Sequence, residues 1–311
     1  MVEDNQIKAQ VSPFAIRKGE IKTFDGKDGY VSMNQIVHKI NIGHINEIHF
    51  AILDLVNEFE FITSRQLYQM LEIKGFDPKS QDKLNNKLEQ LVKSKILTRY
   101  YFTSDEGKGI YRIYCLEKMG KYLLTSKEIE CKWQPSDNTK PVPMIKKRLA
   151  GNQTLIAYLR KVKAFDSYIV KPAITAKVTG KLFKASGGAV KLTKNNKSIQ
   201  FVFEVFRRES DWQKKLVEKM RLYQDFYENF VPGDSGFSSM PQLILICEDE
   251  KHMAECFKEI VTHQVEIPQI KLYFTTDLRQ NEETLENTLV EFKLVDGKYK
   301  MENVELKLLG M

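Results

Sequence analysis

The chain has 311 residues, of which 42% are hydrophobic and 29% charged, an ordinary globular composition with room for two domains of roughly 150 residues each. No apolar run reaches the ~18 to 20 residues of a membrane-spanning helix, and the polar start from Met1 to Gln6 lacks the pattern of a secretory signal. The four cysteines include no Cys-x-x-Cys pair, and the histidines show no metal-ligand spacing. We therefore expect a cytoplasmic protein without a membrane contact, a structural disulfide or a structural zinc.

Positive charge is concentrated in the middle of the chain. Residues 132–200 contain 15 lysines and arginines against two aspartates, a net charge of +13, whereas residues 201–311 carry −7. A segment this basic is costly unless it is solvated or opposed by a polyanion, so nucleic acid is the leading partner. The alternative is a solvated basic face packed beside the acidic last third.

The first 43 residues have two interpretations. Segments 19–24 and 29–33 resemble strands, and the turn 25–28 would join them as a small hairpin. Alternatively, residues 1–43 form an extended arm, as is common at chain ends.

Residues 44–130 have the pattern of three helices. Apolar residues recur at helical spacing over 48–59, Thr63 or Ser64 is a cap for a second, short helix, and Pro78 opens a third. The third helix has an apolar stripe, and its opposite face carries Lys, Asn, Gln and Ser. The stripe consists of Leu84, Leu88, Leu91 and Val92.

A predicted hairpin follows the third helix. Strands 98–102 and 109–116 flank the polar turn 104–108. Three helices followed by a hairpin indicate a winged helix-turn-helix domain. Such a domain either binds DNA through its third helix or serves as a protein-interaction module that never contacts DNA.

Residues 131–143 contain three prolines and form the predicted linker. The remaining residues, 144–311, read as an α/β domain with a mixed central sheet. The expected elements are a helix over 144–162, strands over 166–170, 181–183, 188–193 and 198–206, a helix over 211–230, a strand over 243–247, a helix over 253–261, a strand over 270–275 and a hairpin turning at Asp296-Gly297.

This order is that of the restriction-endonuclease-like, or PD-(D/E)xK, fold. In that fold an Asp and a Glu-x-Lys on neighbouring strands hold Mg²⁺, which activates water. Glu204 occupies the acidic position here, but Phe206 stands at the lysine position, and Asp166 is the sole nearby carboxylate partner. We expect a degenerate nuclease-like domain, with no catalytic residue and no cofactor. Glu204, Asp166 and Mg²⁺ become relevant only if a metal-dependent nuclease is retained.

The first half contains "FAILDLVNEFEFITSRQLYQML" and then "KLEQLVKSKILTRYY" with "GIYRIYCLEKMGKYLL", and the second half contains "GNQTLIAYLRKV" with "FVFEVFRRESDWQKKLVEKMRLYQDFY". These segments resemble the replication-relaxation proteins of plasmids and conjugative elements. Gly187-Gly188 replaces the family's Pro-Asp before the hairpin. The resemblance implies an accessory DNA-binding protein of plasmid or mobile-element replication, transfer or regulation.

The expected partner is double-stranded DNA, read in the major groove by the third helix. A replication, relaxase or regulatory protein is the alternative partner, and residues 144 to 163 are the candidate for a homodimer contact. Asn and Gln suit adenine edges, while Lys suits phosphates or guanine. The expected contacts are Lys79, Ser80, Gln81, Lys83, Asn85, Asn86 and Lys87 on the helix, Arg99, Lys108 and Arg112 on the wing, and Lys146, Lys147, Arg148, Lys177, Lys181, Lys184 and Lys191 in the second domain.

Overall fold

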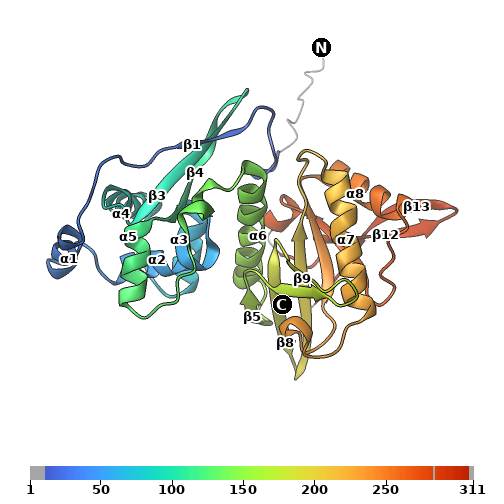
Figure 1. Ribbon diagram of the computed structural model, residues 1–311. Coiled ribbons are helices and arrows are strands. Elements are labelled where there is room, and N and C mark those ends of the chain that lie inside the picture. Colours follow the sequence, from blue (N-terminus) through green and yellow to red (C-terminus); the bar gives the residue numbers. More distant parts are fainter. Residues whose placement is uncertain (1–10, 283, 308–311) are drawn as a thin grey trace, which may run out of the picture.

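The computed structural model describes residues 11–282 and 284–307, and it divides visibly into two masses on either side of α6 (Figure 1). The first half contains β1 (Ile21–Phe24), α1 (Met33–Asn41), α2 (Glu47–Phe59), β2 (Ile62–Thr63), α3 (Ser64–Ile73), α4 (Gln81–Lys93), β3 (Leu97–Ser104), β4 (Gly107–Leu116) and α5 (Lys118–Ser126). The second contains η1 (Pro135–Thr139), α6 (Val142–Lys161), β5 (Phe165–Ile169), β6 (Ala173–Ala176), β7 (Lys181–Lys184), β8 (Gly188–Lys194), β9 (Lys197–Val205), α7 (Trp212–Glu228), η2 (Asp234–Gly236), β10 (Gln242–Cys247), α8 (Glu250–Thr262), β11 (Leu272–Thr276), η3 (Arg279–Asn281), β12 (Leu289–Val295) and β13 (Lys298–Val304).

Helices α3 and α4 begin at side-chain caps. The Thr63 hydroxyl accepts from the amide of Gln66 at 3.2 Å, and the Gln66 side chain accepts from the Thr63 amide at 3.1 Å. The Ser80 hydroxyl accepts from the amide of Lys83 at 3.2 Å. These bonds satisfy amides that have no partner within the helix, so the position of both helix starts follows from the sequence.

The sheet of the first half has the strand order β1-β3-β4-β2, and its strands are antiparallel. The predicted hairpin is confirmed as β3 and β4. A hairpin over 19–33 is wrong, because β1 pairs with β3, from Ile21 opposite Thr103 to Phe24 opposite Tyr100. Ser32 instead caps α1. The N-terminal segment is therefore part of the first-half sheet.

The second half is built on a mixed sheet of seven strands, ordered β13-β12-β11-β10-β9-β8-β5. Strands β5, β8 and β9 are antiparallel, β9, β10 and β11 are parallel, and β12 and β13 return as an antiparallel hairpin. Alternate residues of β9 face opposite sides, so Phe203 packs on Tyr158 of α6 while Val202 joins the cluster under α7 and α8. The expected mixed α and β architecture is confirmed.

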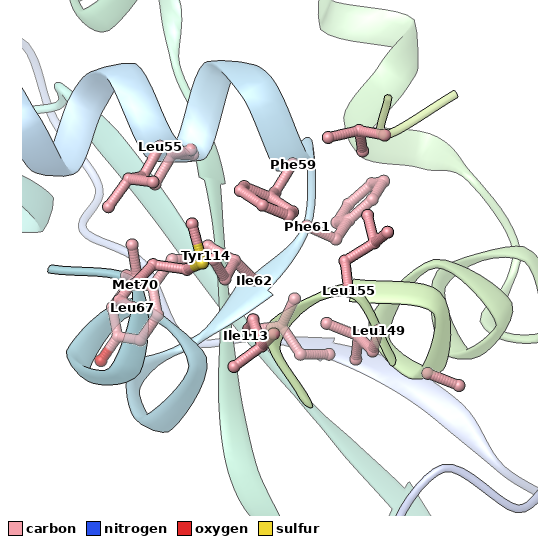
Figure 2. Packing of buried hydrophobic residues seen from close by; sticks show 14 of the residues in the cluster. Leu55, Phe59, Phe61, Ile62, Leu67, Met70, Ile113, Tyr114, Leu149 and Leu155 are labelled. Atoms are coloured by element: carbon pink, nitrogen blue, oxygen red, sulfur yellow. The ribbon is translucent and has the colours of Figure 1, made fainter. Parts of the chain in front are cut away.

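Helix α6 belongs to the core of both halves (Figure 2). Leu149 and Leu155 lie in one buried cluster with Phe59 and Phe61 of the first half. The Gln66 side chain donates to the Leu149 carbonyl at 2.7 Å. The helix begins at Val142, inside the segment predicted as a linker, and that segment also contains η1. The two halves are thus joined by packed structure over residues 135–161.

Residues 11–20 run across both halves. The Tyr111 hydroxyl on β4 donates to the Pro13 carbonyl at 3.0 Å, and the Ile16 amide donates to the Glu248 carboxylate at 3.2 Å. This strap connects the hairpin to the far end of β10. Within the described residues, no helix is both long and apolar enough to cross a membrane.

Candidate nucleic-acid interface

The solvent-facing side of α4 carries a row of polar side chains. Lys83 and Asn86 are exposed, and Lys87 is half-buried beside them. Spacings of three and four residues place these side chains on one face of the helix, opposite the buried leucines. A shallow hollow separates this face from the start of α2, where Asn46 and Glu47 line it.

Gln90 also belongs to this face, although it is absent from the predicted contacts. It follows Asn86 and Lys87 at helical spacing, lines the same hollow and is exposed. Its side-chain oxygen lies 3.2 Å from Nε2 of the buried His49. Extending the row Lys83, Asn86 and Lys87 by one further turn of the helix would have identified Gln90 from the sequence.

Four of the predicted helix contacts are engaged within the protein. Ser80 is the cap of α4, and Gln81 donates to the Asn85 side chain at 3.2 Å. Lys79 lies before the helix with a positive φ of 66° and forms a 2.5 Å ion pair with Asp77. These residues shape the start of α4.

The two arginines of the β3–β4 hairpin are both paired with carboxylates, and Arg112 is the exposed one. Arg99 is largely buried and forms ion pairs with Glu89 of α4 at 2.6 Å and with Asp25 at 2.9 Å. Burial opposes its charge, but the two carboxylates outweigh burial and raise the pKa of Arg99. Arg112 pairs with the same Asp25 at 3.0 Å. Arg99 was predicted as a DNA contact, but the segment after β1 brings Asp25 over the hairpin, so its guanidinium is held within the protein.

The tip of the wing is acidic. Asp105 and Glu106 form the turn between β3 and β4, and the Asp105 amide donates to the Lys18 carbonyl of the strap at 3.2 Å. The side chain of Lys108 lies outside the described part of the chain. Among the described side chains of this hairpin, Arg112 is the exposed cation, and it pairs with Asp25.

The three basic residues predicted to contact DNA near the start of α6 are engaged within the protein. Lys146 is 1% exposed and pairs with Glu20 at 2.6 Å. Lys147 pairs with Glu209, and Arg148 donates to the Val170 carbonyl at 2.9 Å. They were predicted as phosphate contacts, but strap and sheet segments distant in sequence supply the carboxylates and the carbonyl that they contact.

Of the other predicted lysines of the second half, two form ion pairs and two are exposed on a strand. Lys177 pairs with Asp234 at 2.6 Å, and Lys191 pairs with Asp166 at 3.0 Å. Lys181 and Lys184 are exposed on β7. Of the predicted phosphate contacts in this half, these two leave the most open positive charge.

Glu204 is buried in the second half, on the side of the sheet that α7 covers. It accepts from the hydroxyl of Ser186 at 2.5 Å and from Tyr223 at 2.8 Å, and Lys219 of α7 lies 3.5 Å away. Burial and the nearby Glu204 carboxylate raise the pKa of Tyr223 well above its usual value, so that its hydroxyl remains a donor. Lys219 was not recognised in the sequence, because a helix after the strand brings it to the carboxylate.

The structure does not bring Asp166 to Glu204. Asp166 lies beside the Leu192–Ile199 pair of the sheet. Ile199 is five positions along β9 from Glu204, which is roughly 16 Å at the rise of a strand. Ser186 occupies the place where a second carboxylate would be needed. Arg207, which follows Phe206, is buried and forms an ion pair with Asp277 at 2.8 Å. One carboxylate held by a serine, a tyrosine and a lysine is a poor Mg²⁺ site.

Comparisons with known proteins assign no family. No protein-family model matches the sequence, and no curated protein matches it. Among solved structures, the restriction endonuclease FokI is matched with a TM-score of 0.28 and 10% identity, over 74% of this chain and 42% of that one. The chain thus spans less than half the length of that protein, and a similarity this low carries no argument about fold or function.

Proposed function

We propose that this protein binds double-stranded DNA, with α4 lying in the major groove. The observation that carries the proposal is the open face of α4, on which Lys83, Asn86, Lys87 and Gln90 follow one another at helical spacing. The major groove admits an α-helix, amide side chains can bond both donor and acceptor of adenine, and lysines reach phosphates or guanine. The order of β2, α3, α4 and the β3–β4 hairpin supports a winged helix-turn-helix.

The proposed footprint is narrower than the sequence predicts. Arg99 and the basic residues of α6 are removed from it, since they neutralise carboxylates or bond carbonyls inside the protein. Lys83 and Lys87 then supply most of the phosphate contacts at the helix. Such an interface depends on few cations, so its affinity should fall only moderately with salt.

A salt titration tests the assignment. Lys83→Ala with Lys87→Ala should weaken binding to a duplex and reduce the slope of log affinity against log salt by about 1.8, at ~0.9 per phosphate contact. Fluorescence anisotropy of a labelled duplex would measure both quantities. The matched control is Lys93→Ala, in the last turn of the same helix, where the side chain is 57% exposed and pairs with Glu89. If the double variant keeps the wild-type affinity and slope, α4 is not the DNA-binding element.

We extend the proposal to an accessory role in the replication, transfer or transcription control of a plasmid or mobile element. This extension rests on the resemblance to the replication-relaxation proteins. Selection of bound sequences from a plasmid library should recover a site near an origin of replication or transfer or near a promoter. A protein-interaction adaptor would instead retain a protein partner after nuclease treatment and recover no DNA.

A further inference from the structure

Three potential metal ligands meet inside the second half. Cys247 ends β10, and His252 and Cys256 follow on α8, four residues apart and therefore on one face of that helix. All three residues are buried, and their ligand atoms lie within 4.8 Å of one another. No Cys-x-x-Cys pair marks the group in the sequence, because a strand and a helix contribute to it separately.

The spacing of the two sulfur atoms suits a tetrahedral ion. The Sγ atoms of Cys247 and Cys256 are 3.9 Å apart. Two thiolates bound to zinc at ~2.3 Å in tetrahedral geometry are separated by about 3.8 Å. The backbone thus holds the two thiols at the edge length of a zinc tetrahedron.

The imidazole of His252 completes the group. The ring is fully buried, its Nδ1 accepts a hydrogen bond from the Glu248 amide at 3.3 Å, and its Nε2 has no hydrogen-bond partner among the described residues. A buried polar atom without a partner costs roughly 1–3 kcal/mol. Coordination by Nε2 gives this atom a partner, and it requires the ring hydrogen to move to Nδ1, which then releases the Glu248 amide.

The charge balance is compatible with a divalent ion at this buried position. Two thiolates, a neutral imidazole and one divalent cation have no net charge, so the ion adds no net charge to the interior. Thiolate and imidazole ligands together select zinc over magnesium or calcium, which prefer oxygen. The three residues supply three of the four tetrahedral positions.

We infer that Cys247, His252 and Cys256 form a zinc-binding site that fastens α8 to the end of β10. The site adjoins Glu248, whose carboxylate receives the Ile16 amide of the strap. It also adjoins Asp249, which pairs with Arg208 at 2.5 Å. Bound zinc fixes the corner of the second half on which the N-terminal strap lies. This inference does not depend on DNA binding.

Cobalt is the probe, because Co²⁺ bound to thiolates absorbs where zinc does not. The reduced full-length protein, stripped of metal with a chelator, is titrated with Co²⁺. We expect one equivalent to bind, with a thiolate-to-cobalt absorption in the near ultraviolet and intense tetrahedral bands in the visible, all lost on adding Zn²⁺. Trp133→Phe leaves Trp212, whose ring centre lies 4.9 Å from that of His252, as a fluorescence reporter that bound Co²⁺ quenches.

Variants locate the ion. Cys247→Ser and Cys256→Ser should each abolish the thiolate absorption, whereas Cys131→Ser, at a half-buried cysteine outside the group, should leave it unchanged. Folded wild-type protein that binds no Co²⁺ overturns the inference without any variant. Binding that lacks the thiolate absorption, or that persists when both Cys247 and Cys256 are serine, is binding elsewhere and overturns it as well. Circular dichroism of each variant establishes that it is folded.

Discussion

Arg99 lies where three segments of the chain meet, and its two ion pairs connect them. Its guanidinium joins β3 to Glu89 of α4 and to Asp25 after β1. From the sequence alone, Arg99 is one more positive charge that could bind DNA. The structure uses it to hold the proposed recognition helix against the sheet.

Arg99→Ala should therefore reduce stability. With Arg99 11% exposed, the variant removes the nearer partner of Glu89 and leaves Asp25 with Arg112 alone, and we expect a loss of about 1–3 kcal/mol in the free energy of unfolding. Urea denaturation measures it. Arg112→Ala, at a side chain that is 52% exposed and pairs with the same Asp25, should cost under about 1 kcal/mol. Equal losses for the two variants would contradict the role assigned to Arg99.

At the scale of elements, Asp225 of α7 fixes the small β6–β7 sheet. Its carboxylate accepts from the amides of Val178 and Thr179 at 3.0 and 3.1 Å. Burial raises its pKa, but these hydrogen bonds outweigh burial and hold the pKa of Asp225 below its usual range. A carboxyl with a depressed pKa in the folded state stabilises the protein above its unfolded-state pKa of ~3.9. That contribution is lost as the pH falls through the lower, folded-state value.

Asp225→Asn should accordingly destabilise the protein by about 1–3 kcal/mol near neutral pH, since hydrogen bonds to a charged group are replaced by neutral ones. Urea titrations at pH 7 and near pH 3 would compare it with the wild type. The difference between the two proteins should shrink at the acidic pH. A difference that stays constant would mean that the charge of Asp225 is not involved.

The elements themselves could be predicted, but their long-range contacts could not. Helical spacing located α2, α3, α4 and α6, and alternating or apolar runs located β3, β4 and β8 to β11. Strand β1 pairs with β3 almost 80 residues later, and no local pattern specifies such a partner. The same reason applies to Arg99 and Lys146, because a basic residue looks alike in sequence whether it faces solvent or a distant carboxylate. The open face of α4 was predictable because a single helix defines it.

At the scale of the whole molecule, the two halves share a core through α6. Gly151 of this helix lies against the loop before β8, where an added Cβ would be 2.6 Å from the Ser186 carbonyl oxygen and 2.7 Å from Gly187 Cα. The backbone of this loop leaves no room for a side chain at position 151. Glycine is needed at this position although alanine is the better helix former.

Gly151→Ala should lower the stability of the entire chain by about 1–3 kcal/mol, as overpacking does. Because the core is continuous, thermal unfolding followed by Trp212 fluorescence and by far-ultraviolet circular dichroism should shift together. Gln153→Ala, two residues later on the same helix, loses only a 3.4 Å contact to Gln69 and serves as the control. Two separated transitions would show that the halves unfold independently.

The contacts of the strap, residues 11–20, also determine when during synthesis it can dock. Ile16 contacts a glutamate 232 residues later, and Ser12 donates to Asp277, which is 265 residues later. The segment is therefore synthesised well before these partners and stays undocked until they have been made. Contacts of such large sequence separation form slowly. A chaperone or protease that meets the nascent chain can bind the strap during this interval.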